Sequence, residues 1–147
     1  MALLVPGGPA VLTPLAGGVS SLIVKVDLAG RSVCIKRALP QLKVASEWKA
    51  PVERSDAEAA WIRTAAGIVP GAVPVLLGQD VTTRAFVMEY LDPAKYPVWK
   101  TQLLAGHADP ATARAVAASL VAIHNATANS PTIAAAFPNA ASFHALR

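Results

Sequence analysis

An alternation of side-chain types across residues 22–36 constrains the fold more than any other feature of the sequence. Successive side chains of a strand lie on opposite faces of a sheet, so a period of two predicts strands with two distinct faces. One turn signal, Ala29-Gly30-Arg31, divides the pattern into two strands. The apolar positions are Leu22, Val24, Val26 and Leu28 in the first strand, and Val33 and Ile35 in the second. Residues 11–16 precede them as a further short strand that Pro14 favours at a sheet edge, so the sequence predicts a three-stranded antiparallel meander.

A helix and two further strands are predicted after an irregular segment at residues 40–53. The helix begins between residues 51 and 55 and runs to about Gly67, with Pro70 behind it as a stop signal. Its apolar positions, spaced as one face of an α-helix, are Ala57, Ala60, Trp61, Thr64, Ala65 and Ile68. Strands at residues 73–77 and 84–91 follow, around a polar turn at residues 79–83. The expected fold is α+β, with a five-stranded antiparallel sheet and one helix.

The character of the sequence changes after Leu91, where a second unit is predicted to begin. Asp92-Pro93 ends the strand pattern, and Pro97 opposes an early return to regular structure. A helix is expected from the Asp109-Pro110 start signal to about residue 128. Its predicted apolar face comprises Ala113, Val116, Ala117, Leu120, Val121 and His124. The chain therefore divides into residues 1–91 and residues 92–147, with room for one more short helix in the tail.

Composition narrows the classes of protein to which the chain can belong. Its 147 residues carry a net charge of +4, but lysine and arginine are scattered with no aromatic platform between them, so nucleic-acid binding is not predicted. We read no signal peptide, no membrane-spanning apolar stretch and no metal-ligand spacing, and the single cysteine fits a reducing, cytoplasmic location. A mean hydropathy of +0.44 with 15% charged residues predicts more apolar surface than the chain covers, and hence self-association or a partner chain.

Two segments near the first strands carry groups suited to binding phosphate. In Gly17-Gly18-Val19-Ser20-Ser21, the glycines let backbone N–H groups approach phosphate oxygens, and the hydroxyls of Ser20 and Ser21 can add hydrogen bonds. An ordinary hairpin turn would have the same composition. In Val33-Cys34-Ile35-Lys36, the period of two places Cys34 and Lys36 on one face, as in the V-A-I-K pattern of kinase strands. A solvated strand lysine is the alternative to a phosphate-binding one.

Two later segments complete the set. In Arg54-Ser-Asp-Ala-Glu58, Glu58 lies beside the predicted apolar stripe of the helix, so it can face the sheet rather than water. A surface glutamate that only favours the helix would look the same. Val87-Met-Glu-Tyr-Leu91 ends the last predicted strand, where backbone groups could bind a ligand, and a buried strand end is the alternative.

Taken in order, the four segments resemble those of aminoglycoside phosphotransferases and choline-kinase-type enzymes, with the methylthioribose-kinase-like branch as the nearest variant. The resemblance covers essentially the whole chain. It implies a protein-kinase-like small lobe that binds ATP, followed by the helical start of a large lobe. Lys36 would pair with the phosphates and Glu58 would hold it in place.

The same resemblance implies the adenine site. Cys34 and Met88 would line the adenine pocket, and the carbonyl of Glu89 and the N–H of Leu91 would bind the adenine edge. In this family an H-G-D…N stretch and a later aspartate position the substrate hydroxyl and hold magnesium. Nothing after Leu91 matches them, and the acidic residues there are Asp92 and Asp109.

The chain is therefore expected to supply a nucleotide-binding lobe, with the magnesium ligands and the pocket for the alcohol acceptor in a missing lobe. Three interpretations stay open. The chain is a fragment of a kinase, one part of a split enzyme completed by a complementary chain, or a non-catalytic nucleotide-binding or protein-interaction module that keeps the fold. The first is preferred.

Overall fold

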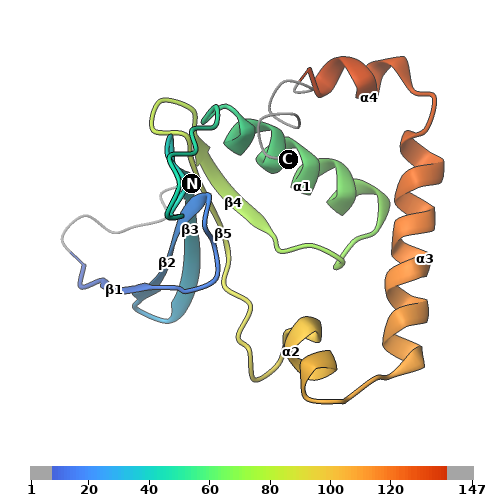
Figure 1. Ribbon diagram of the computed structural model, residues 1–147, viewed down its shortest axis with the longest axis horizontal. Coiled ribbons are helices and arrows are strands. Elements are labelled where there is room, and N and C mark those ends of the chain that lie inside the picture. Colours follow the sequence, from blue (N-terminus) through green and yellow to red (C-terminus); the bar gives the residue numbers. More distant parts are fainter. Residues whose placement is uncertain (1–7, 139–147) are drawn as a thin grey trace.

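The computed structural model describes residues 8–138 and shows an α+β fold built on one five-stranded antiparallel sheet (Figure 1). The strands are β1 (Val11–Pro14), β2 (Ser21–Leu28), β3 (Arg31–Ala38), β4 (Leu76–Asp80) and β5 (Ala85–Glu89). The helices are α1 (Arg54–Ile68), α2 (Trp99–Leu104), α3 (Pro110–Thr127) and α4 (Pro131–Ala136). The predicted five-stranded sheet is confirmed. The segment read as lacking a signal peptide and the last part of the predicted second unit lie outside the described residues.

The strand order is β1-β2-β3-β5-β4, which places β3 at the centre and β1 at an edge, as Pro14 predicts. The register defines two neighbouring rows of side chains across β2, β3 and β5. The first row is Ile23, Lys36 and Phe86, and the second is Lys25, Cys34 and Met88. Cross-strand partners share a face and neighbouring rows are about 7 Å apart along a strand. Cys34 and Lys36 therefore lie on one face, as predicted.

Helix α1 covers the face of the sheet that carries these rows. Ala59 and Ile62 of α1 pack against Phe86, which is completely buried. The apolar face predicted for this helix is correct at Ala65, which is buried, but wrong at Trp61, which is 40% exposed. The buried positions are Ser55, Ala59, Ile62 and Ala65. Small side chains let the helix backbone approach the sheet closely, and a pattern of apolar positions overlooks a buried polar residue such as Ser55.

Strands β4 and β5 are both shorter than, or displaced from, the predicted ranges. β4 begins three residues late because residues 70–75, with Pro70 and Pro74, stay irregular. The turn starts at Asp80, whose carboxylate accepts hydrogen bonds from the N–H groups of Thr82 and Thr83 at 2.9 and 3.4 Å. β5 ends at Glu89, so residues 90 and 91 follow the strand rather than belong to it.

Three helices follow the sheet. α2 is not predicted by the sequence, because it has six residues, starts two positions after Pro97 and has no side-chain cap. α3 begins as predicted, since Asp109 accepts hydrogen bonds from the N–H groups of Ala111 and Thr112 and Pro110 occupies the first helical position. α4 is the short helix for which the tail has room.

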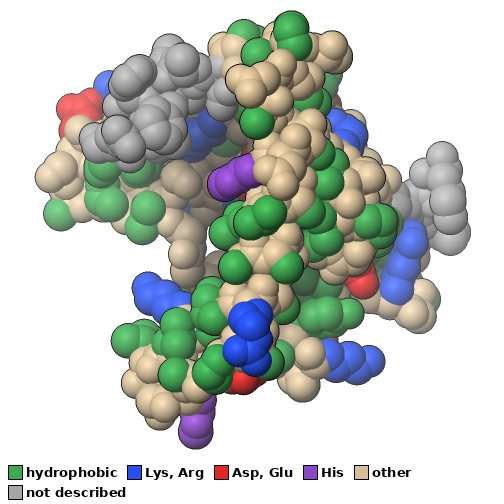
Figure 2. Space-filling model, turned by 90° about the vertical axis from the view of Figure 1, so that its right-hand side faces the viewer, with side chains coloured by type: hydrophobic (Ala, Val, Ile, Leu, Met, Phe, Trp, Pro, Cys, Tyr) green, Lys and Arg blue, Asp and Glu red, His purple; other side chains and the backbone are tan. Residues whose placement is uncertain are grey.

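The predicted apolar face of α3 is not buried. Ile123 is the buried side chain of this helix, whereas Val116, Leu120 and Val121 are 38%, 48% and 57% exposed. Figure 2 looks onto this side and shows hydrophobic side chains along the molecule's surface. The helix is apolar on several sides, so hydropathy alone does not indicate which one contacts α1. Within residues 8–138, no helix combines the length and the hydropathy needed to cross a bilayer.

Candidate functional site

The ion pair expected between Lys36 and Glu58 is present. Nζ of Lys36 lies 2.5 Å from Oε1 of Glu58, and this contact joins the central strand β3 to α1 across 22 residues of sequence. The two side chains are 21% and 38% exposed, so the pair lies at the rim of the interface between α1 and the sheet. An ammonium group has three hydrogen-bond donors. Glu58 is the hydrogen-bond partner of Lys36 among the described residues, which leaves two donors for a ligand.

The glycine turn between β1 and β2 adjoins the row that contains Lys36. Gly17 has a φ of +109°, a conformation that favours glycine. A Cβ atom on Gly18 would lie 3.3 Å from Cδ1 of Ile23, the cross-strand partner of Lys36. The side chain of Ile23 thus lies between the glycine turn and Lys36. Because residues 17 and 18 are glycines, no side chain of their own covers the backbone of the turn.

The two serines of the predicted turn differ in their environment. Ser20 belongs to the turn and its carbonyl accepts a hydrogen bond from the N–H of Leu39 at 3.0 Å. Ser21 is the first residue of β2, is paired with Ala38 and is only 7% exposed. The boundary of the predicted turn is therefore one residue too long, because the ladder with β3 begins at Ser21.

Arg54 connects the glycine turn to the start of α1, a role that the sequence does not predict. Its guanidinium donates to the carbonyls of Ser20 and Leu39 at 2.5 and 2.7 Å, and to those of Ala50 and Pro51 at 3.0 and 2.6 Å. A cation in the first turn of a helix is unfavourable for the helix dipole. That local conflict is the one signal in the sequence that could have marked Arg54 as serving another purpose.

The second row places the side chains of Cys34 and Met88 next to the cation of Lys25. Cys34 is 4% exposed and lies between Met88 and Lys25. Nζ of Lys25 lies 2.9 Å from Oδ1 of Asp27 and 4.9 Å from the centre of the Tyr90 ring. Lys25 and Tyr90, which the sequence analysis did not single out, therefore join the row to the segment that follows β5.

Glu89 and Leu91 lie at the end of β5, beside a cavity of about 750 Å³ that also contacts Val75 and Tyr96. The N–H of Glu89 donates to the carbonyl of Val75 at 2.8 Å, and its carboxylate accepts from the N–H of Val75 at 3.3 Å. The side chain of Glu89 is thus engaged with the segment before β4. The assignment of the Glu89 carbonyl and the Leu91 N–H to a ligand edge stays a prediction.

Burial raises the pKa of the Cys34 thiol above its ordinary value of 9.0, and the charge of Lys36 opposes this in part. The unfolded thiol loses its proton at a lower pH than the folded one. The resulting contribution to stability is complete below the unfolded pKa and is lost as pH rises through the folded pKa.

We therefore expect the free energy of unfolding to fall less steeply above pH 9 in Cys34→Ala than in the unchanged protein. Urea titrations at a series of pH values from 7 to 10.5 would measure the difference between the two curves. Parallel curves over the whole range would contradict the assigned burial of the thiol.

The described residues contain no group of three or more His, Cys, Asp or Glu side chains placed to hold a metal ion. An open pocket of about 430 Å³ lies on the α4 side of the ion pair, lined by Arg54, Glu58, Trp61 and Phe137 among others. Solvent therefore reaches Glu58 from that direction.

In comparisons with known proteins, no family model and no curated protein sequence matches the chain.

Proposed function

We propose that this chain provides the nucleotide-binding lobe of an ATP-dependent small-molecule phosphotransferase of the aminoglycoside phosphotransferase and choline-kinase type. The observation that carries the proposal is the ion pair between Lys36 in the central strand and Glu58 in α1, next to a glycine turn. Kinase-like enzymes use a strand lysine held by a helix glutamate to bind the phosphates of ATP.

The chemistry of these groups fits a triphosphate. Two unused donors of the Lys36 ammonium and the backbone of Gly17 and Gly18 offer positive potential without side chains in the way. Glu58 prevents the ammonium from turning away, so its charge is already in place when phosphate arrives. The row of Cys34 and Met88, about 7 Å further along the strands, would meet the adenine ring.

The reaction would also need magnesium and an acceptor, which groups outside this chain would hold. ATP would supply the phosphoryl group, and magnesium would neutralise part of its charge, with ligands from a lobe outside this chain. The acceptor would be a small-molecule alcohol whose pocket lies in the same lobe, either in one polypeptide or in a complementary chain. We place the protein in the cytoplasm, where a free thiol such as that of Cys34 is stable.

ATP with magnesium is expected to slow the alkylation of Cys34. The thiol lies in the row beside Lys36 and is the single cysteine of the chain, so intact mass reports its modification without ambiguity. At ten to a hundred times the dissociation constant, the rate should fall roughly 10- to 100-fold if only the unliganded protein reacts. The measurement is best made near pH 9, because burial raises the thiol pKa.

The Lys36→Met variant should lose this protection, because the neutral side chain retains the length of lysine but not its charge. Lys49→Met is the matched control, since Lys49 pairs with Glu47 at the surface and both side chains are about 70% exposed. It should keep the full effect of ATP. Equal alkylation with and without nucleotide in the unchanged protein would reject the proposal.

A second candidate function, a protein-interaction module that has kept the fold, is supported by the exposed apolar side chains of α3. The same experiment separates the two. Alkylation that is indifferent to ATP, together with concentration-dependent association in sedimentation, would favour the interaction module.

A further inference from the structure

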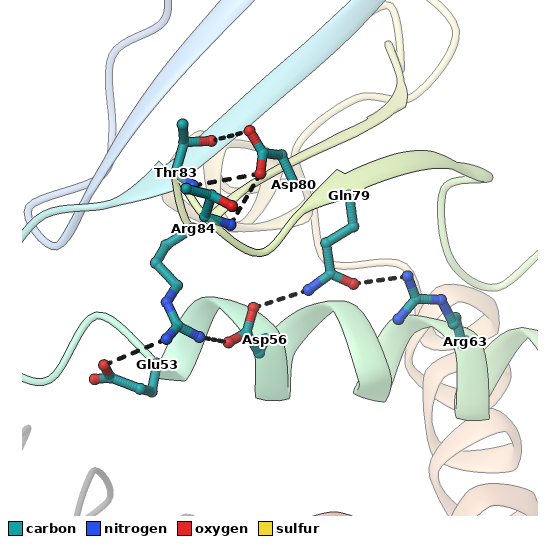
Figure 3. A network of polar contacts seen from close by, with 8 residues as sticks. Glu53, Asp56, Arg63, Gln79, Asp80, Thr83 and Arg84 are labelled. Atoms are coloured by element: carbon teal, nitrogen blue, oxygen red, sulfur yellow. Dashed lines mark hydrogen bonds and ion pairs between the residues drawn. The ribbon is translucent and has the colours of Figure 1, made fainter.

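A polar network joins α1 to the turn between β4 and β5 (Figure 3). The guanidinium of Arg84 donates to the carboxylate of Asp56 and lies 3.7 Å from Oε1 of Glu53. Nε2 of Gln79 donates to Oδ1 of Asp56 at 2.9 Å, and Oε1 of Gln79 accepts from Arg63 at 2.7 Å. Asp56 and Arg63 of α1, together with Glu53 at its N-cap, are thus connected to one hairpin.

The hairpin side of this network is itself held in place. The Asp80 carboxylate accepts hydrogen bonds from the backbone of residues 82 and 83 and, at 2.8 Å, from the hydroxyl of Thr83. Arg84 follows with a φ of +54°, which directs its side chain from the end of the turn across to α1. The side chains of Arg84 and Asp56 are 34% and 31% exposed, so the contact is shielded on one side.

The network and the Lys36–Glu58 pair lie on opposite flanks of α1. Successive residues of an α-helix are about 100° apart. Asp56 and Glu58 therefore project about 200° apart around the axis, with the buried residues Ser55, Ala59 and Ile62 between them. One flank is attached to β4 and to the turn before β5, and the other to β3.

The buried side of α1 carries few large side chains that would oppose rotation about the helix axis. Ser55, Ala59 and Ala65 are small, and Ile62 is the one large side chain among the buried positions. A smooth ridge of this kind does not interlock with a sheet as larger side chains do. The packing of Ile62 against Phe86 holds the helix at one point, and the polar contacts on its two flanks, those of Arg54 included, then set its rotation.

From this arrangement we infer that Arg84, Asp56 and Gln79 are positioning residues that hold Glu58 against Lys36. They act from the flank away from the ammonium and form no hydrogen bond or ion pair with Lys36 or Glu58 among the described residues. Releasing them lets α1 rotate, and the distance between the carboxylate and the ammonium increases. The consequence for ATP rests on the proposed function, whereas the consequence for the ion pair does not.

The test measures both consequences in Arg84→Met and Asp56→Asn. Trace labelling of amines with acetic anhydride, read by peptide mass spectrometry, should show Lys36 labelled about three- to tenfold faster than in the unchanged protein. Lys43, Lys49, Lys95 and Lys100 serve as internal references and should not change. Glu58→Gln marks the upper limit of the effect, and Lys49→Met controls for the loss of one surface charge.

The ATP concentration that half-protects Cys34 should rise by a similar factor in the same two variants. Global loosening would accelerate the labelling of every lysine, so a selective effect on Lys36 separates positioning from general destabilisation. Asp56→Asn preserves size and keeps the inference testable if Arg84→Met does not fold. Unchanged Lys36 labelling in a folded variant would overturn the inference. Faster Lys36 labelling without any ATP effect in the unchanged protein would uphold it while rejecting the nucleotide site.

Discussion

Replacing Phe86 with alanine is expected to lower the free energy of unfolding by about 3–5 kcal/mol, the usual cost of removing a large buried aromatic side chain. Phe86 is a β5 residue that is completely buried and packs against Ala59 and Ile62 of α1. The side chains around it, Ala59 and Ile62, cannot expand to fill the space. Urea denaturation followed by circular dichroism, with the slope compared between variants, would give the change.

Phe86→Leu is the matched control, because it keeps an apolar side chain of intermediate volume and should cost less than about 1.5–2 kcal/mol. A loss of under 1 kcal/mol in Phe86→Ala would mean that α1 does not depend on this contact. Since Phe86 is the cross-strand partner of Lys36, its loss is also expected to loosen the ion pair with Glu58.

The second large effect is expected at Arg54, where alanine should cost about 2–4 kcal/mol, because hydrogen bonds from a charged group contribute about 1.5–3 kcal/mol and are not additive. Four carbonyls lose the hydrogen bond from Arg54 at once, in the glycine turn, after β3 and before α1, and that of Ser20 keeps the N–H of Leu39 as a donor. Thermal and urea unfolding would measure the loss.

Arg54→Lys should recover only part of the stability, since one ammonium cannot reach four carbonyls as the planar guanidinium does. Arg63→Ala is the control on the same helix. Arg63 is exposed and, within residues 8–138, has one side-chain hydrogen bond, to Gln79, so its loss should stay within about 0.5 kcal/mol. Equal effects of the two alanine substitutions would show that the carbonyl cluster contributes nothing special.

The part of the fold that sequence predicts well is the part governed by neighbours in the chain. The period of two across β2 and β3 and the turn at Gly30 are local signals, and both are confirmed. The start of α3 is equally local, since Asp109 caps the helix through its own next residues. Such features depend on backbone geometry within a few residues.

The errors arise where packing decides. The sequence favours Trp61 and Ile68 on the inner face of α1, yet the sheet accepts Ser55 and Ala59 because the helix lies close to it. The α3 stripe containing Leu120 has a helical period, yet the Leu120 side chain stays 48% exposed. α2 has no capping side chain that would announce it.

The candidate site shows the same division. The contact of Lys36 with Glu58 follows from a resemblance in order and spacing, and the structure contains it. Two of the carbonyls that Arg54 contacts are 15 and 34 residues away, and the carboxylate that Arg84 contacts is 28 residues away. Contacts over such separations leave no period in a sequence, so only coordinates reveal them.

Because α3 buries little apolar surface, stability against unfolding is distributed unevenly along the chain. With Ile123 as its one buried side chain, this helix can unwind while exposing little additional apolar area, and the packing around Phe86 stays intact. The sheet and α1 then form the cooperative nucleus of the molecule. The backbone hydrogen bonds of α3 therefore open by local unfolding, independently of the sheet. They become protected only where another surface excludes water from them.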